Sequence, residues 1–150
     1  MIGNILTKYG KININVKEVI FTENMNKKQK FVRIQVRYTG KTGKPVGIFG
    51  ACHHVINSSY YPYNVTDNEK QLFQDTENWF NEHLPNPPFY KDGNPNKYIT
   101  WFKTDSTNHM IEKLYPLMDL LDKYKVKYDV VYTNFVGKIV YEDEFQVAVE

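Results

Sequence analysis

Two arginines on one predicted strand are the side chains best suited to ligand chemistry. Residues 31–38 alternate apolar and polar side chains, which predicts a β-strand whose polar face carries Arg33, Gln35 and Arg37. A basic strand face of this kind can hold phosphates, nucleic acid or an acidic protein. The competing interpretation is that both arginines form internal ion pairs with acidic residues elsewhere in the chain: Glu82, Glu142 or Asp143.

A proline-rich stretch between the two tryptophans supplies the second candidate. Proline fixes its own φ and restricts the residue before it, so residues 85–96 are predicted to form a rigid loop without regular secondary structure. Phe89 or Tyr90 would anchor a binding surface there, with Lys91 beside them. Alternatively, both aromatic side chains fill the core beneath the loop. Because successive residues of an extended segment point in opposite directions, we expect Phe89 to point inward and Tyr90 outward.

Asn94, in the turn that ends this loop, and Trp101, in the predicted strand after it, complete the candidate binding residues. A pocket that joined Arg37 to Tyr90 and Trp101 could stack a base on an aromatic ring while the arginine held a phosphate. Such a pocket is therefore the feature to look for in the structure.

The histidines and the cysteine point only weakly to catalysis. His53 and His54 are adjacent on a predicted helix, where their side chains diverge by about 100° and lack a partner at metal-ligand spacing, so a structural or surface role is expected. His83 lies on the apolar side of the next predicted helix, near its C-terminus, as a core or capping residue or as the base of a small enzyme. Cys52 is expected to be an unreactive core thiol. No metal ligands and no cofactor are predicted.

A partial phosphate-binding motif fails on its spacing. Gly40-Lys41-Thr42 resembles the end of a P-loop, but the motif requires a glycine where this chain has Gln35. No serine lies in a nucleophile-elbow pattern either. The sequence therefore offers no catalytic set.

Hydrophobic periodicity predicts the elements that position these residues. A helix is expected over residues 46–57 with Pro45 at its first turn, burying Cys52 and placing His54 on the opposite face, with His53 at the edge. A second helix runs to about residue 84 from a capping box formed by Thr66 and Glu69. Its apolar side is predicted to carry six residues: Leu72, Phe73, Thr76, Trp79, Phe80 and His83.

A third helix begins at Ser106 and is interrupted by Pro116. Strands are predicted for five further segments: residues 12–16, 98–103, 126–132, 139–141 and 145–149. The fold class is α+β, with an antiparallel or mixed sheet of about five to six strands and three helices packed on one side.

Composition indicates a single globular domain over residues 1–150, with 41% hydrophobic and 15% aromatic residues. One cysteine excludes an internal disulfide, and neither a signal peptide nor an apolar run of membrane-spanning length is visible, so a cytoplasmic protein without membrane contact is expected. The net charge is +2, yet residues 1–50 hold ten Lys or Arg against two acidic residues. This asymmetry predicts a basic face in the first third of the chain.

The chain resembles a family of small bacterial or phage proteins of uncharacterised activity. The resemblance covers roughly residues 30–149 and rests on several short segments. These are Gly47-Ile48-Phe49, Trp79-Phe80-Asn81-Glu82-His83-Leu84-Pro85, Pro87-Pro88-Phe89, Gly93-Asn94-Pro95, Thr100-Trp101-Phe102-Lys103 and the tail from Gly137 to Val147. The resemblance implies no activity.

Three function hypotheses follow. The leading one is a non-enzymatic binding protein that acts through the rigid loop and the basic strand face, as bacterial or phage interference and inhibitor proteins do. Its partner would be a protein or a phosphate-bearing small molecule. The protein could also form a homodimer. The second is a nucleotide or nucleic-acid binder that uses Arg33, Arg37 and aromatic side chains. The third is a small enzyme with a histidine base.

Overall fold

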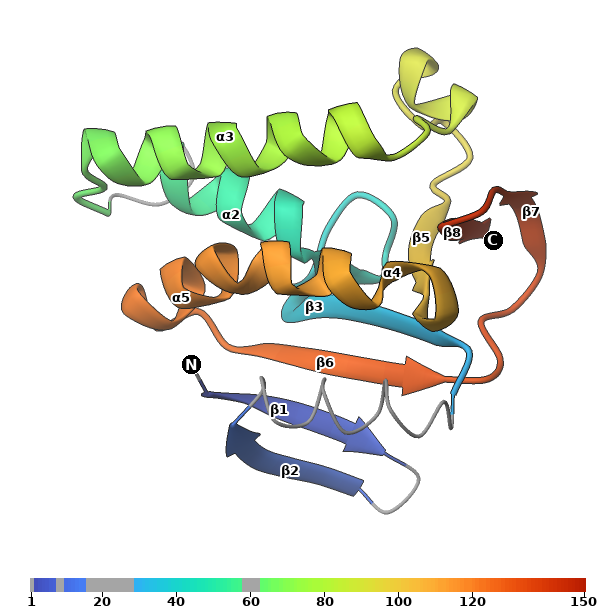
Figure 1. The fold of residues 1–150 in the computed structure, drawn as a ribbon, viewed down its shortest axis with the longest axis horizontal. Helices are drawn as coiled ribbons and strands as arrows, with labels where there is room; N and C mark the ends of the chain where they lie inside the picture. The colour runs from blue at the N-terminus through green and yellow to red at the C-terminus, as the bar shows by residue number, and fades with distance from the viewer. Residues whose placement is uncertain (1, 8–9, 16–28, 58–62) are drawn as a thin grey trace.

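One sheet, covered on one face by helices, forms the framework of the protein (Figure 1). The computed structural model describes residues 2–7, 10–15, 29–57 and 63–150. The strand order is β2-β1-β6-β3-β5-β8-β7, and β4 pairs with β3 outside this path. The six strands β3 to β8 pair antiparallel, whereas β1 joins β6 in parallel and pairs with β2. The predicted α+β class with a mixed sheet is confirmed.

The strands are β1 Ile2–Thr7, β2 Gly10–Asn15, β3 Phe31–Thr39, β4 Pro45–Gly47, β5 Ile99–Lys103, β6 Tyr128–Thr133, β7 Ile139–Glu142 and β8 Gln146–Val149. The α-helices are α2 Ile48–Ile56, α3 Asp67–His83, α4 Thr104–Ile111 and α5 Tyr115–Lys123. Two 3₁₀ helices are η1 Pro88–Asp92 and η2 Glu112–Leu114. No helix in the described ranges has the length and apolarity needed to cross a membrane.

Strand β3 lies at the centre of the sheet and of the core. Its alternation is as predicted, because Val32, Ile34 and Val36 are buried beneath the helices. Helix α5 supplies the opposing layer through Leu117 and Leu121, which are also fully buried. One contiguous apolar cluster therefore joins the sheet to the helices.

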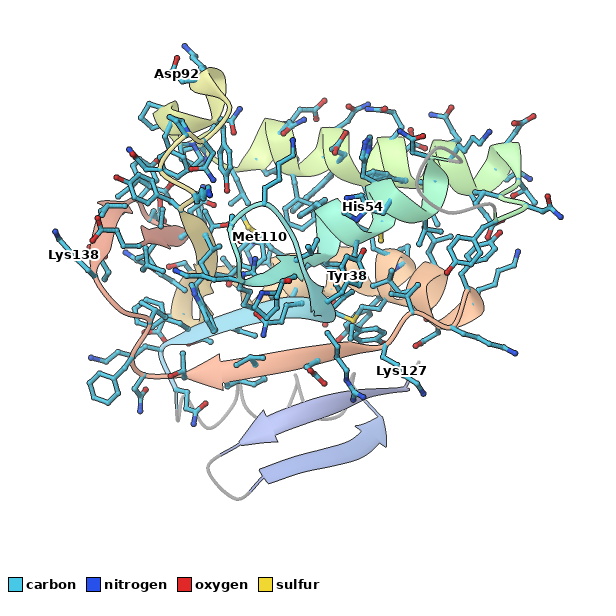
Figure 2. All side chains as sticks on the ribbon, turned by 180° about the vertical axis from the view of Figure 1, so that it is seen from behind. Tyr38, His54, Asp92, Met110, Lys127 and Lys138 are labelled. Carbon is cyan, nitrogen blue, oxygen red and sulfur yellow. The ribbon has the colours of Figure 1, made fainter. Side chains whose placement is uncertain are left out.

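The predicted start of the first helix is wrong. Pro45 and Gly47 pair with β3 as strand β4, and α2 begins only at Ile48. Proline is tolerated there because a short edge strand does not need every N–H group. The histidine orientations are also reversed: His53 is exposed, while His54 Nδ1 lies 2.9 Å from the Tyr38 hydroxyl (Figure 2).

Helix α3 begins with the predicted capping box, since the Thr66 hydroxyl and the Glu69 carboxylate bond to each other's backbone N–H groups. Its predicted apolar side is too wide, because the helix buries only Phe73 and Phe80. His83 is exposed and stacks on Trp79 with a ring separation of 4.0 Å. Helix α3 is the outermost layer in Figure 1 and packs on α2 and α5. A narrow apolar stripe on α3 is therefore enough for this packing.

The long helix predicted after β5 is divided, as its proline suggested. Helix α4, η2 and α5 follow one another, and Pro116 lies in the first turn of α5. The predicted start at Ser106 is wrong, because α4 begins at Thr104. Thr104 donates its hydroxyl to the Gln29 carbonyl and its N–H to the Lys30 carbonyl, which fixes the helix start beside β3.

Truncating Leu117 tests this core. Leu117→Ala should lower the free energy of unfolding by about 2–5 kcal/mol, because a fully buried side chain is replaced by a cavity. Leu72→Ala on α3 is the control, since Leu72 is 38% exposed and should cost far less. Urea unfolding measures both, and equal losses would contradict the helix register.

The capping box should make stability depend on pH. Desolvation acts to raise the pKa of Glu69, but hydrogen bonds from the Thr66 backbone, the Tyr124 hydroxyl and Lys123 outweigh it and lower the pKa to about 2. The carboxylate therefore stabilises the fold above its unfolded pKa of roughly 4.3, and this contribution disappears as the pH falls through about 2.

We expect Glu69→Gln to lower the melting temperature at pH 7 and to approach the wild type near pH 2. Glu82→Gln, at an exposed position of the same helix, is the control and should change little at either pH. A Glu69→Gln difference that grows on acidification would refute the assignment.

Candidate functional site

The sheet divides along one edge of β3. Strand β5 pairs with β3 only at Phe31 and Val32, whereas β4 pairs with it at Gln35 and Thr39. Between these contacts the edge of β3 at Arg33 is covered by neither strand. A side chain from β3 can therefore reach across the opening.

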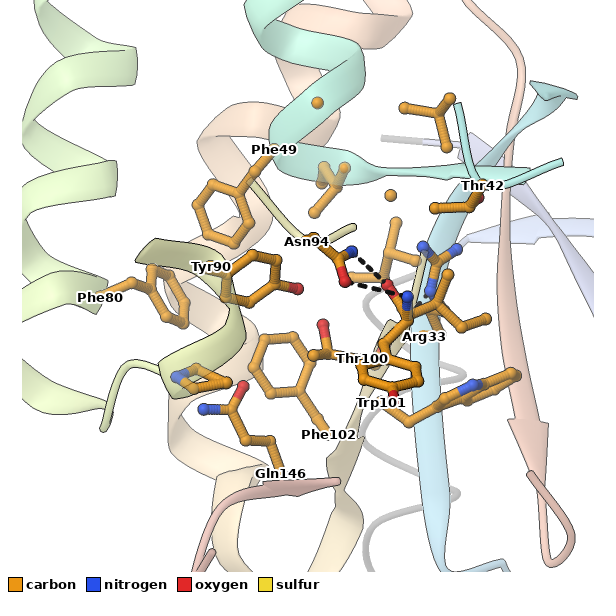
Figure 3. A pocket seen from close by; sticks show the side chains of 18 of the residues that line it. Arg33, Thr42, Phe49, Phe80, Tyr90, Asn94, Thr100, Trp101, Phe102 and Gln146 are labelled. Atoms are coloured by element: carbon orange, nitrogen blue, oxygen red, sulfur yellow. Dashed lines mark hydrogen bonds between the residues drawn. The ribbon is translucent and has the colours of Figure 1, made fainter. Parts of the chain in front are cut away.

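A pocket of about 520 Å³ lies at this division. Its wall is formed by the β3–β4 hairpin, the first turn of α2, the end of α3, residues 84–87 and 98–102, and the side chains of Tyr90, Asn94 and Gln146. Figure 3 shows the pocket with Arg33 at one side and the rings of Phe49, Phe80, Tyr90 and Phe102 toward α3. This volume is in the range of sites for small organic molecules.

Arg33 joins the two diverging strands at the pocket. Its Nε donates to the Thr100 carbonyl of β5 at 3.1 Å, and its Nη1 donates to the Pro45 carbonyl of β4 at 2.9 Å and to Gln35 Oε1 at 2.8 Å. All three acceptors are neutral. Among the described residues no carboxylate forms an ion pair with this guanidinium.

Burial makes this cation costly. It lowers the pKa of Arg33 to about 10, and the nearby Tyr90 phenol offsets part of the effect. A buried guanidinium held only by neutral acceptors favours an anion in its vicinity.

A second positive feature lies beside the guanidinium. Gly47 is the N-cap of α2, it provides no side-chain cap, and the first turn of the helix has no acidic residue. The backbone N–H groups of that turn carry the positive end of the helix dipole. A Cβ atom added at Gly47 would lie 3.2 Å from Arg33 Nη2, so glycine permits the close approach of helix start and guanidinium.

The side of the pocket toward α3 is aromatic. Phe49 and Phe80 meet edge to face with a ring separation of 5.2 Å, and Phe102 lies 6.2 Å from Phe80. These rings come from three elements, α2, α3 and β5. The pocket thus combines an apolar side with a cationic side.

The loop before β5 is held in place at both ends. Gln146 Nε2 of β8 donates to the Pro85 carbonyl at 2.8 Å, and the Asn94 side chain bonds both the N–H and the carbonyl of Tyr98. The loop was expected to lack regular structure, yet Pro88–Asp92 forms the 3₁₀ helix η1 and ends at Gly93 with φ 75°. Proline favours the first turn of such a helix, and glycine favours its left-handed end.

The two loop aromatics differ in their surroundings. Phe89 is half-buried and packs edge to face on Tyr98 and Tyr141, with ring separations of 5.2 and 6.2 Å. Tyr90 is 41% exposed and lines the pocket. The arrangement makes Tyr90 available to a ligand and gives Phe89 a packing role.

The structure brings together four of the seven predicted binding residues, namely Arg33, Tyr90, Asn94 and Trp101. Phe89, Lys91 and Arg37 do not line the pocket. Arg37 instead lies 3.4 Å from Asp129, a partner that the sequence interpretation did not name. The pocket thus joins Arg33, and not Arg37, to Tyr90 and Trp101.

The predicted acidic partners of the arginines are not those observed. Glu142 pairs with Lys103, and Asp143 accepts hydrogen bonds from Tyr141 and Gln146. The predicted basic face of residues 1–50 falls partly outside the described residues, and so do the side chains of the lysines before Lys30.

Several lining residues were missed from the sequence. Helix α3 contributes Glu77, Phe80 and Asn81, which follow a spacing of i, i+3 and i+4 and so share one helix face. That spacing is readable in the sequence, but the search for an apolar side passed over its polar members. Gly47 is also readable, as a glycine before an apolar run.

The histidines and the cysteine considered from the sequence lie outside the lining of the pocket. His53 and His83 do not line the pocket, and Cys52 is buried, with its pKa raised by desolvation. No group of three or more His, Cys, Asp or Glu side chains in the described ranges could hold a metal ion.

Alanine substitutions separate the two loop aromatics. Phe89→Ala should lower the free energy of unfolding by about 1–3 kcal/mol more than Tyr90→Ala, because Phe89 loses ring contacts while Tyr90 is already partly in water. Chemical unfolding of both variants measures this. The opposite order would make Tyr90 the packing residue.

Comparisons with known proteins identify no family for this chain. No protein-family model, no curated protein and no solved structure matches the chain. Function must therefore be argued from the pocket itself.

Proposed function

We propose that the protein binds a small molecule that combines an apolar, preferably aromatic, body with an anionic group. The observation that carries the proposal is the partly buried Arg33 guanidinium, which lines a pocket of about 520 Å³ and has no carboxylate partner in the described ranges. This is the binding-protein hypothesis with a small molecule as the partner.

The charged groups at the pocket support a negatively charged ligand group. Arg33 and Lys41 line the pocket, and Glu77 is the lining carboxylate. The uncapped start of α2 adds a partial positive charge next to Arg33. An anionic group placed between guanidinium and helix start would accept hydrogen bonds from both, in the manner of phosphate and carboxylate sites.

The aromatic side chains that line the pocket support a ligand with an apolar, preferably aromatic, body. Phe49, Phe80 and Phe102 lie on the side of the pocket toward α3, and Tyr90 extends over the same side in Figure 3. Aromatic side chains bury a planar group at a low cost in side-chain entropy. Nucleotides and aromatic carboxylates both combine an aromatic group with a negative charge. The proposal therefore specifies the charge of the anionic group and includes both phosphates and carboxylates.

A matched set of compounds tests the proposal. We expect 4-butylbenzoate or 4-butylphenyl phosphate to bind in isothermal titration and to raise the melting temperature, while uncharged 4-butylbenzamide binds at least about tenfold more weakly. The expected factor corresponds to one hydrogen-bonded charge contact of about 1.5–3 kcal/mol. Equal binding of the amide, or no binding of either anion at millimolar concentration, would overturn the proposal.

Arg33→Gln should remove the preference for the anion, whereas Arg37→Gln should keep it. The two variants make the same change on the same face of β3, but Arg37 pairs with Asp129 outside the pocket. Should Arg33→Gln fail to fold, Gly47→Ala serves instead, because its φ of −72° accepts alanine and the added methyl group presses on Arg33. Retained anion preference in that variant would contradict the site.

A further inference from the structure

The pocket contains a second unpaired charge besides Arg33, and it has the opposite sign. Glu77 of α3 lines the pocket and is half-buried. Among the described residues it forms neither an ion pair nor a hydrogen bond. A pocket-lining carboxylate without a partner gains from a cation or a hydrogen-bond donor placed beside it.

Helix periodicity directs Glu77 into the site. Glu77 lies three residues before Phe80 and four before Asn81, and both of these also line the pocket. Residues at this spacing share one face of a helix, so the carboxylate belongs to the face that the pocket exposes. Glu82 of the same helix is exposed and does not line the pocket.

Arg33 and the helix that carries Glu77 lie on opposite sides of the aromatic rings (Figure 3). Arg33 belongs to β3, and in Figure 3 the rings of Phe49, Tyr90 and Phe102 lie between it and α3, the helix that carries Glu77. A ligand that fills the space would meet a cation at one end, apolar rings in the middle and a carboxylate at the other end. The ligand's anionic, apolar and cationic groups should therefore follow the same order as the pocket features that they contact.

We infer that the ligand is a zwitterion with its charges at opposite ends, whose anionic group meets Arg33 and whose ammonium or other cationic group meets Glu77. This rests on the proposed function, because it concerns the same pocket and the same anionic contact. It narrows the ligand class from aromatic or apolar anions to those that also carry a cationic group across the apolar body.

Lys41 is the internal alternative partner for Glu77. It also lines the pocket, it is exposed, and no ion pair joins it to Glu77 among the described residues. Holding a long exposed lysine in one geometry costs side-chain entropy and gives little net stability. A cation that arrives on a ligand already bound at Arg33 avoids most of that cost.

Compounds that differ in one amino group test the inference. We expect 4-(4-aminobutyl)benzoate or the shorter 4-(aminomethyl)benzoate to bind wild-type protein at least about threefold more tightly than the matching 4-butyl- or 4-methylbenzoate, as measured by isothermal titration at low salt. Glu77→Gln should abolish this gain, while the alkyl benzoate should bind at least as tightly as before, because the like charge of the carboxylate is removed. Glu82→Gln is the matched control and should retain the gain.

The outcomes distinguish the two proposals. If the alkyl benzoates bind through Arg33 but neither amino compound binds more tightly, the zwitterion inference fails and the proposed function stands. If the gain persists in Glu77→Gln, the ligand's cationic group is not held by Glu77 and the inference again fails. If neither the benzoates nor 4-butylphenyl phosphate binds, the proposed function fails first.

Discussion

The guanidinium of Arg33 holds together two strands, β4 and β5, that pair with separate stretches of the same edge of β3. Its bonds to the Thr100 and Pro45 carbonyls replace the ladder that a continuous strand would have formed there. The division that Arg33 spans is also the opening in which the pocket forms. The same side chain therefore satisfies the backbone and supplies the charge of the site, and burial lowers its pKa to about 10.

The sequence was informative about local structure. The alternation over residues 31–38 predicted β3, the pair Thr66 and Glu69 predicted the start of α3, and Pro116 predicted the break before α5. Each of these depends on residues close together in the chain. The start of α2 was wrong because Pro45 and Gly47 pair with β3, and pairing between strands overrides a local helix signal.

The difference between Arg33 and Arg37 could not be read from the sequence. They are the same residue type on the same predicted strand face. What separates them is the register with β6, which places Val131 opposite Arg33 and Asp129 opposite the neighbouring Gln35, within reach of Arg37. Register is set by the whole sheet. The pocket depends on the same kind of information, since it exists where β5 departs from β3.

The hydrogen bond from Gln146 to the Pro85 carbonyl affects the stage of folding at which the pocket can form. These residues are 61 positions apart, and Arg33 and Thr100 are 67 apart. Contacts of such long sequence separation close large loops and form late during folding. A chain emerging from the ribosome would present β3 and α3 long before β8 arrives to fix the loop. The pocket can thus form in full only after β8 has been synthesised.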